Sequence, residues 1–305
     1  MTAHPFVAHT TSRALYGSVE ALPLLLIDTP QCRAVVALQG AQVLEFTPKV
    51  EGHRPWLWLS PKARFVEGEA IRGGIPLCLP WFGVNREDPK KPKHGFVRQR
   101  PWQLDAVHEE GGAVTLLLSF HYNRLEPSLF TTPFSATLAI TLSDALSLAL
   151  TFTNLAQQAA GFSFAFHSYF AVESIETTVV EGLAGRTFLD NTRALSPHIQ
   201  QGAITFGAEV DRVYEGTVTA QQLTTAAHSL LIEGNGCPTC IVWNPGQAVA
   251  STLADIGEGF RRFACVERGA AFADTITLAA GGIATAKLLI REKLPKNLTK
   301  CQSCL

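Results

Sequence analysis

The stretch FSATLAITLSDALSLALTFTN, residues 134–154, indicates the fold class of this chain. Each half, 134–142 and 146–154, is a short run rich in Leu, Ile, Phe and Thr, which is typical of a β-strand. Ser143 and Asp144 between them suit a tight turn. The stretch therefore predicts two successive antiparallel strands.

The same pattern continues on both sides of this hairpin, with short apolar runs separated by Gly, Asn, Asp or Pro. We expect further strands at residues 21–27, 34–38, 40–46, 56–59, 102–108, 113–121, 162–167, 177–181, 229–233, 240–243, 262–267, 275–278 and 283–290. Helical periodicity is scarce, and residues 253–260 contribute one turn at most. A parallel α/β sheet would need amphipathic helices between its strands, so we predict an all-β fold, a large sandwich of two antiparallel sheets.

The domain organisation follows from length and composition. The 305 residues show no internal repeat, linker or composition shift, and hydrophobic residues make up 47% of them, enough for a sizeable core. We therefore expect a single domain over residues 1–291. Residues 292–305 are polar and contain Pro295, which predicts a flexible C-terminal tail.

Charge and cysteine usage exclude several classes of function. The formal net charge of −1 argues against a nucleic-acid partner, and no apolar run is long enough to cross a membrane. The odd number of seven cysteines suits a reducing compartment, so we predict a cytoplasmic protein. Two CxxC pairs, Cys237 with Cys240 and Cys301 with Cys304, have ligand types for zinc. Because they are far apart in the chain, we expect free thiols and no metal.

Residues 71–100, IRGGIPLCLPWFGVNREDPKKPKHGFVRQR, combine polar, glycine and aromatic residues without a periodic face. This segment predicts the rim of a ligand site. Arg72, Lys93, His94 and Arg98 are donors for an anionic or hydroxyl-rich ligand, beside aromatic faces on which a sugar ring can lie. Gly73 and the glycine after it allow close approach of a ligand. The alternative is a basic surface loop pinned by core aromatic residues.

Three further residues are candidates for chemistry. His167 ends an apolar aromatic run, where burial makes its protonation state tunable. Glu267 ends another apolar strand, where a carboxylate is costly unless it is paired or used. Asp211 lies beside Arg212 in a polar turn. The alternatives are a core histidine for His167, an outward-facing strand end for Glu267 and a local ion pair with Arg212 for Asp211. Spacing alone does not choose among these interpretations.

Six segments, in this order, resemble the hexose-6-phosphate mutarotases, a branch of the aldose 1-epimerase family with the galactose-mutarotase-like fold. They are IRGGIPLCLPWFG (71–83), KHGFVR (93–98), FHSYFAV (166–172), EVDRVYEG (209–216), VWNPG (242–246) and FACVE (263–267). The resemblance implies that His167 is the catalytic acid and Glu267 the base. It implies that Asp211 holds sugar hydroxyls.

The resemblance also gives roles to the rim residues. Arg72 and Arg98 match arginines that are implied to bind the phosphate, and Lys93 and His94 become rim contacts. The implied reaction is interconversion of the α and β anomers of a hexose 6-phosphate, above all glucose 6-phosphate, without metal or organic cofactor. The family also implies a monomer.

Two rival functions remain open on the sequence. A non-catalytic sugar-phosphate sensor would keep the phosphate clamp without turnover, although an intact acid–base pair argues against it. The second rival is a different enzyme on a similar sandwich, either a mutarotase for neutral aldoses or a glycoside hydrolase or lyase. Hydrolysis usually requires two carboxylates that face the scissile bond, whereas this chain offers one carboxylate with a histidine.

Overall fold

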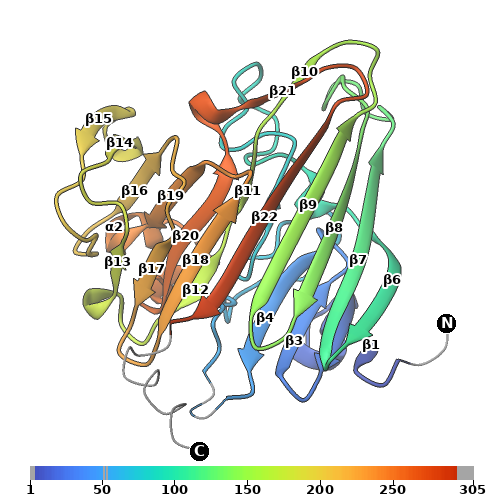
Figure 1. Cartoon of the computed structure of the whole chain (residues 1–305), viewed down its shortest axis with the longest axis horizontal. Coiled ribbons are helices and arrows are strands. Elements are labelled where there is room, and N and C mark those ends of the chain that lie inside the picture. Colours follow the sequence, from blue (N-terminus) through green and yellow to red (C-terminus); the bar gives the residue numbers. More distant parts are fainter. Residues whose placement is uncertain (1–3, 51, 53, 294–305) are drawn as a thin grey trace, which may run out of the picture.

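The computed structural model describes residues 4–50, 52 and 54–293. Two eight-stranded antiparallel sheets and two smaller sheets make up most of this part of the chain (Figure 1). The prediction of an all-β antiparallel sandwich is therefore confirmed.

The first large sheet has the strand order β13-β17-β18-β22-β9-β8-β7-β6. Its strands are β6 (Gln103–Glu110), β7 (Ala113–Tyr122), β8 (Phe134–Leu142), β9 (Leu146–Asn154), β13 (Val179–Glu181), β17 (Gln221–Thr224), β18 (Ser229–Asn235) and β22 (Ile283–Glu292). The predicted hairpin is β8–β9, in which Phe134 pairs with Asn154 and Leu142 with Leu146. Every second residue of both strands is buried, so one face of this sheet covers the core.

The second large sheet has the order β15-β14-β16-β19-β20-β11-β5, and β12 also pairs with β20. Its strands are β5 (Leu77–Cys78), β11 (Phe164–Phe166), β12 (Tyr169–Ala171), β14 (Thr187–Asp190), β15 (Ser196–Ile199), β16 (Val210–Tyr214), β19 (Thr239–Asn244) and β20 (Phe263–Ala270). All eight residues of β20 are buried. This strand is therefore covered on both faces, which removes both of its charged side chains from water.

The remaining elements are short. A four-stranded sheet contains β1 (Val7–Thr11), β2 (Pro23–Asp28), β3 (Cys32–Ala37) and β4 (Gln42–Pro48), and β10 (Ala160–Phe162) pairs with β21 (Ile276–Leu278). The helical segments are α1 (Ser12–Tyr16), α2 (Gly246–Ala250), η1 (Val97–Gln99), η2 (Ile175–Thr177), η3 (Asn191–Arg193), η4 (Gly257–Arg262) and η5 (Phe272–Asp274). Over the described ranges, none of these helices has the length and apolar character needed to cross a bilayer.

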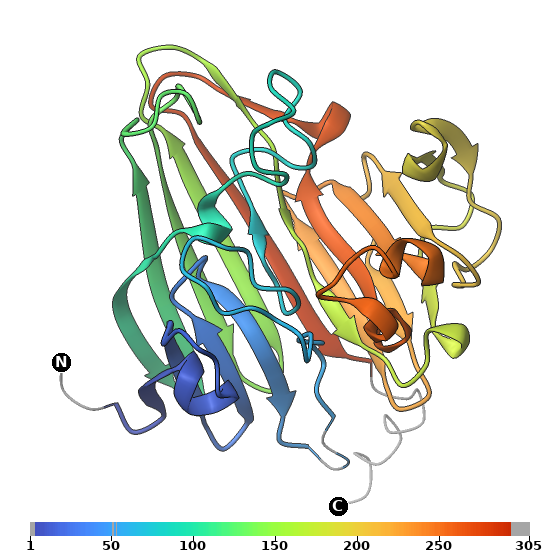
Figure 2. The ribbon, with the colours of Figure 1, turned by 180° about the vertical axis from the view of Figure 1, so that it is seen from behind.

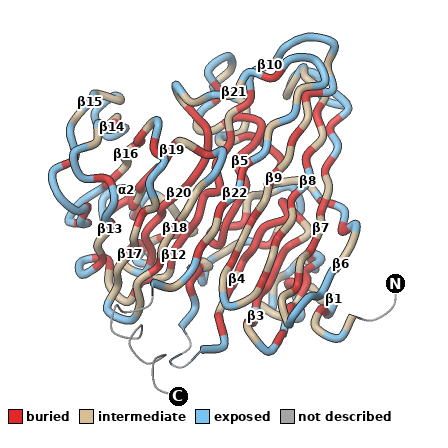
Figure 3. Tube along the Cα trace, viewed as in Figure 1, coloured by how far each residue is buried: buried red, intermediate tan, exposed pale blue. Residues whose placement is uncertain are grey.

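The sheets form two layers. The first large sheet is one layer, and the four-stranded sheet lies beside the second large sheet in the other (Figures 1 and 2). Buried segments run along the strands of both layers, whereas exposed residues gather at the connecting turns (Figure 3). The largest buried cluster includes Phe134 and Leu148 from one layer and Val43 and Val266 from the other, so the core fills the space between them.

Two predicted strands differ from the structure. Residues 56–59 form isolated bridges, Leu57 to Phe170 and Leu59 to Gly73, instead of a strand. Residues 162–167 are divided, because β10 ends at Phe162 and β11 begins at Phe164 in a different sheet. Apolar composition alone does not reveal that the chain changes its pairing partner at this point.

Other elements also differ from the predictions. The helical turn predicted within residues 253–260 occurs as η4, while α2, β1 and β14–β17 had no clear signal in the sequence. Two residues of the tail predicted over 292–305 belong to the sheet instead, since Glu292 is the last residue of β22 and the Lys293 amide donates to the Ser229 carbonyl at 2.8 Å. Residues 294–305, with Cys301 and Cys304, lie outside the described residues.

Candidate active site

A break in strand pairing brings His167 next to Glu267. Both β11 and β12 pair with β20, with Phe166 opposite Arg268 and Tyr169 opposite Cys265. The two residues between these registers, His167 and Ser168, leave the ladder opposite the middle of β20. His167 instead donates its backbone amide to the Pro76 carbonyl at 2.9 Å. The histidine therefore lies beside Glu267 at the centre of the second large sheet.

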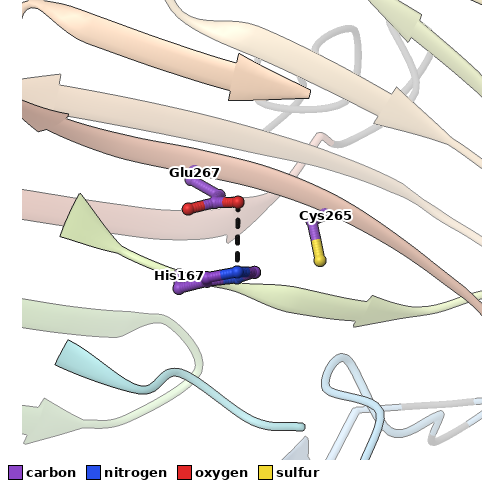
Figure 4. Close-up of side chains that lie close together, drawn as sticks. All are labelled: His167, Cys265 and Glu267. Carbon is purple, nitrogen blue, oxygen red and sulfur yellow. Dashed lines mark ion pairs between the residues drawn. The ribbon is translucent and has the colours of Figure 1, made fainter. Parts of the chain in front are cut away.

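The two side chains form a close buried pair. His167 Nδ1 lies 3.3 Å from Glu267 Oε1, and Figure 4 shows the imidazole and the carboxylate pointing toward one another. Relative exposure of the residues is 6% for His167 and 1% for Glu267. Among the described residues, neither His167 Nδ1 nor Glu267 Oε2 has a hydrogen-bond partner, so the approach is close but not aligned as a hydrogen bond. Buried groups left unsatisfied in this way are expected at sites where a ligand completes the bonding.

Burial displaces the two ionisation equilibria in opposite directions. It raises the pKa of Glu267 well above its ordinary value, and the negative charge of Asp211 adds to this effect. It lowers the pKa of His167 well below its ordinary value, and the positive charges of Arg98, Arg72 and Lys93 act in the same direction. Both displacements therefore favour the uncharged forms, the carboxylic acid of Glu267 and the neutral imidazole of His167.

Aromatic rings fix the plane of the imidazole. The Tyr169 ring is stacked on the His167 ring, with centroids 4.8 Å apart and an interplanar angle of 4°. The rings of Trp243 and His94 meet His167 edge-on, at 5.9 Å and 5.4 Å. His167 is thus held between three rings while it faces Glu267.

The pair lies in a cavity of about 800 Å³. All seven residues singled out from the sequence line it: Arg72, Lys93, His94, Arg98, His167, Asp211 and Glu267. They come from segments that are distant in sequence, and the fold brings them to one face of the second large sheet. The volume is within the range usual for small-molecule sites.

The glycines of the rim allow other parts of the protein's own backbone to approach closely. Gly73 and Gly74 have positive φ angles of 113° and 62°. A Cβ at these positions would lie 2.5 Å from the Trp58 carbonyl oxygen and 2.1 Å from that of Val43. The close approach predicted for a ligand is therefore an approach of neighbouring backbone, and it places Arg72 at the cavity.

His94, within the rim segment, has a left-handed backbone conformation with φ of 69°. Its backbone amide donates to the Gly83 carbonyl at 2.7 Å, and its Nδ1 accepts from the Gly83 amide at 3.2 Å. Burial and the charge of Arg98 lower the pKa of His94 well below its ordinary value, so the ring is neutral. With Nδ1 as an acceptor, the proton of the neutral ring is on Nε2.

The two arginines of the rim have different surroundings. Arg72 Nε donates to Asp255 Oδ2 at 2.8 Å, and Arg72 Nη1 donates to the Tyr169 hydroxyl at 2.9 Å. Arg98 donates from Nη2 to the Lys93 carbonyl at 2.8 Å, and its buried Nε has no partner in the part of the chain that the structure describes. Within residues 4–50, 52 and 54–293, neither Arg98 nor Lys93 forms an ion pair with a carboxylate. The cavity therefore contains two positive charges that no direct ion pair engages within the described residues.

Asp211 lies on β16 and does not pair with its neighbour Arg212. Its Oδ2 accepts from Asn191 Nδ2 at 2.6 Å, whereas Arg212 donates to Gln200 Oε1 at 2.7 Å. Burial raises the pKa of Asp211, while the hydrogen bond from Asn191 opposes this effect. The local Asp–Arg pair considered from the sequence is thus absent, and Asp211 presents a carboxylate to the cavity.

One set of side chains near the pair has the donor types of a metal site. The donor atoms of His167, Cys265 and Glu267 lie within 4.8 Å of one another (Figure 4). A metal would require the Cys265 thiolate, but burial raises the pKa of this thiol well above its ordinary value. The positive charges of Arg98 and Lys93 also oppose a dication there. The arrangement suits acid–base chemistry better than metal binding.

Several residues at the site had no role assigned from the sequence. Tyr169 and Trp243 lie within the motifs FHSYFAV and VWNPG, so those motifs could have indicated them. Asn191 and Asp255 lie in segments without any motif, and only the tertiary structure brings them to Asp211 and Arg72.

Comparison with known families decides the class of this chain. A model of the family described as aldose 1-epimerase matches residues 23–291. The chain belongs to the aldose 1-epimerase family. It is accordingly an isomerase that acts on a small-molecule sugar.

Individual members of the aldose 1-epimerase family support this assignment. A protein of Salmonella typhimurium, named "Putative glucose-6-phosphate 1-epimerase", is 32% identical over 269 residues, which cover 87% of this chain and 89% of that protein. A protein of the same name from Cenchrus ciliaris is 33% identical over 273 residues, covering 85% and 80%.

Solved structures agree with the fold of the aldose 1-epimerase family. The crystal structure of a "putative mutarotase" from Salmonella typhimurium has a TM-score of 0.86 and 26% identity, and covers 96% of each chain. A galactose mutarotase-like protein from Clostridium acetobutylicum has a TM-score of 0.71 at 14% identity, covering 94% of this chain and 99% of that protein, and shows the fold alone.

Proposed function

We propose that this isomerase interconverts the α and β anomers of a hexose 6-phosphate, with glucose 6-phosphate as the preferred substrate. The observation that carries the proposal is the positive charge of Arg98 and Lys93, which form no direct ion pair among the described residues, in the cavity that contains His167 and Glu267. A neutral sugar offers no charge to balance these groups, whereas a phosphate does. The names of the Salmonella typhimurium and Cenchrus ciliaris relatives support the same substrate.

In the proposed mechanism, the His167–Glu267 pair moves two protons. Glu267 takes the proton of the anomeric hydroxyl, and His167 donates a proton to the ring oxygen from Nε2, the nitrogen that does not face Glu267. The bond between the anomeric carbon and the ring oxygen breaks and leaves an open aldehyde. Rotation about the first carbon–carbon bond presents the other face of the carbonyl, and ring closure returns both protons.

The pair carries the same number of protons before and after ring opening. It begins as imidazolium and carboxylate and becomes neutral imidazole and carboxylic acid. The opposite pKa displacements of His167 and Glu267 favour the second state, which matches the open-chain intermediate. Phosphate bound near Arg98 and Lys93 would offset the positive charges that lower the pKa of His167, and would therefore favour its protonation when substrate is present.

The remaining residues orient the substrate. Asp211 would accept hydrogen bonds from sugar hydroxyls, and the neutral His94 would donate from Nε2. Arg98 would hold the phosphate with its free donors. Arg72 would add its Nη2, which makes no hydrogen bond within the described residues.

The test is anomer equilibration with purified protein. Freshly dissolved α-glucose 6-phosphate and α-glucose are followed in parallel by polarimetry or by NMR of the anomeric protons. We expect strong acceleration for glucose 6-phosphate and weak acceleration for glucose. Equal acceleration of both sugars would indicate a mutarotase for neutral aldoses, and binding without acceleration would indicate a sensor.

A further inference from the structure

A chain of contacts leads from Asp255 to the candidate acid. Asp255 Oδ2 accepts from Arg72 Nε at 2.8 Å, Arg72 Nη1 donates to the Tyr169 hydroxyl at 2.9 Å, and the Tyr169 ring is stacked on His167. Asp255 lies between α2 and η4 and is itself fixed, because its carbonyl accepts from Ser60 Oγ at 2.5 Å. Four side chains from three segments of the chain thus form one continuous path.

The middle of this path has little freedom to move. Tyr169 is 1% exposed, and its ring lies between His167 and Trp58, whose ring is stacked at 5.9 Å and 29°. Its buried hydroxyl accepts a hydrogen bond from Arg72. The Arg72 and Asp255 side chains are 26% and 30% exposed, so their ion pair is partly shielded from water. Arg72 thus connects Asp255 to the hydroxyl of the ring that is stacked on His167.

We propose that Asp255, Arg72 and Tyr169 are positioning residues that set the orientation of the His167 imidazole for proton transfer. This inference rests on the proposed function of His167 as the acid. Arg72 then has two roles, contact with phosphate and alignment of the histidine, whereas Arg98 contacts phosphate without belonging to the chain. The two arginines of the rim differ in consequence: loss of Arg98 affects phosphorylated substrates, and loss of the chain affects every sugar that the enzyme turns over.

Steady-state kinetics on glucose 6-phosphate and on free glucose separate these roles. Asp255→Asn keeps the shape of the side chain but removes the charge, and Tyr169→Phe keeps the stacked ring but removes the hydroxyl. We expect each to lower kcat about threefold to tenfold on both sugars, the effect of losing one hydrogen bond, with KM for glucose 6-phosphate little changed. Asp255→Glu should restore part of the kcat lost in Asp255→Asn.

A control variant and the ring signal of His167 distinguish the proposed positioning role from a general loss of structure. Glu258→Gln alters an exposed carboxylate of η4 that pairs with Arg261 and does not line the cavity, so it should leave kcat unchanged. In protein with isotope-labelled histidine, the His167 ring signal is identified by its loss in His167→Asn. It should shift or broaden in Asp255→Asn and Tyr169→Phe and remain in place in Glu258→Gln.

Two results would overturn the proposal. One is a rise in KM for glucose 6-phosphate with unchanged kcat on both sugars, which would make Asp255 and Tyr169 supports of phosphate binding alone. The other is an unmoved His167 signal in both variants. If the unaltered protein accelerates neither sugar, the proposed function fails, but the histidine spectra still decide whether the chain holds His167.

Discussion

His167 Nδ1 lies 3.3 Å from Glu267 Oε1 because the chain leaves its ladder on β20 at His167, between β11 and β12. The ladder between β11 and β20 ends at the Phe166–Arg268 pair and resumes between β12 and β20 at the Tyr169–Cys265 pair. On the core side of β20, Val266 packs into the main hydrophobic cluster, while Glu267 faces the cavity. An ionisable pair is therefore placed at the middle of a fully buried strand, facing the cavity.

The first prediction concerns the acid–base pair. His167→Ala and Glu267→Gln should each lower kcat for glucose 6-phosphate by at least about a hundredfold, because each removes a proton carrier. Circular dichroism and thermal melting should show a folded protein in both cases. Turnover close to that of the unaltered enzyme in either variant would contradict the assigned roles.

The second prediction concerns the phosphate. Arg98→Ala should lower kcat/KM for glucose 6-phosphate by about tenfold to a hundredfold, since a hydrogen bond to a charged group is lost. With each enzyme assayed at its own pH optimum, kinetics on free glucose should change little, because that sugar has no phosphate. Arg98→Lys should restore part of the loss, as lysine keeps the charge but not the planar fork. Equal losses on both sugars would show that Arg98 supports the rim or the sugar hydroxyls instead.

The third prediction concerns pH dependence, measured on free glucose so that ionisation of the phosphate does not contribute. Activity requires the one-proton state of the pair, so kcat/KM should be bell-shaped. The acid limb reflects a second proton on His167, whose pKa burial and nearby positive charge lower, and should lie below the ordinary range of histidine. The basic limb reflects loss of the last proton and is governed by Glu267, whose pKa burial raises.

Removal of the positive charge of Arg98 tests this interpretation through the direction in which the limbs of the pH profile move. Arg98 lowers the pKa of His167 and also that of Glu267. Arg98→Ala should therefore move both limbs to higher pH. Limbs that stay in place, or move to lower pH, would mean that other groups control the profile.

The fourth prediction concerns the rim. Gly95 has a φ of 70°, and a Cβ there would lie 2.1 Å from the Leu79 carbonyl oxygen. Gly95→Ala should lower the free energy of unfolding by about 2 kcal/mol or more, because a left-handed conformation and a backbone clash are combined. It should also reduce activity, since the adjacent His94 is displaced.

Gly68→Ala is the matched control for this variant. Gly68 also has a positive φ, 79°, but open space surrounds its Cβ position. This variant should lose only about 1 to 2 kcal/mol, the conformational cost, and should keep full activity. Denaturant unfolding measures both variants, and equal losses would show that the clash at Gly95 is relieved without consequence.

The fifth prediction concerns metal. The proposed reaction needs one acid and one base, so treatment with a chelator should leave kcat unchanged, and purified protein should contain no stoichiometric zinc. Elemental analysis provides the measurement. One tightly held zinc ion per chain would show that a cysteine-containing cluster binds metal, and Cys265→Ser would then establish whether the cluster beside Glu267 holds it.

Much of the fold could be predicted because its signals are local. Residues 134–154 contain both strands and the turn of a hairpin, so β8 and β9 occur with the predicted bounds. The strands at 56–59 and 162–167 were wrong or incomplete, because apolar composition does not reveal where a chain changes its pairing partner. The candidate residues were indicated by their motifs, and the structure brings all seven to one cavity.

By itself, the sequence determined which side chains are available and which strands form, since propensity and turn chemistry act over a few residues. The register of β11 and β12 on β20, which sets the distance between His167 and Glu267, depends on contacts between distant segments. Only the tertiary structure decided that Arg72 is paired with Asp255 while Arg98 is not, because both are arginines of one rim and differ only in what folds beside them. The tertiary structure also places the charges of Arg72 and Arg98 near the buried His167, where both lower the pKa of its imidazole.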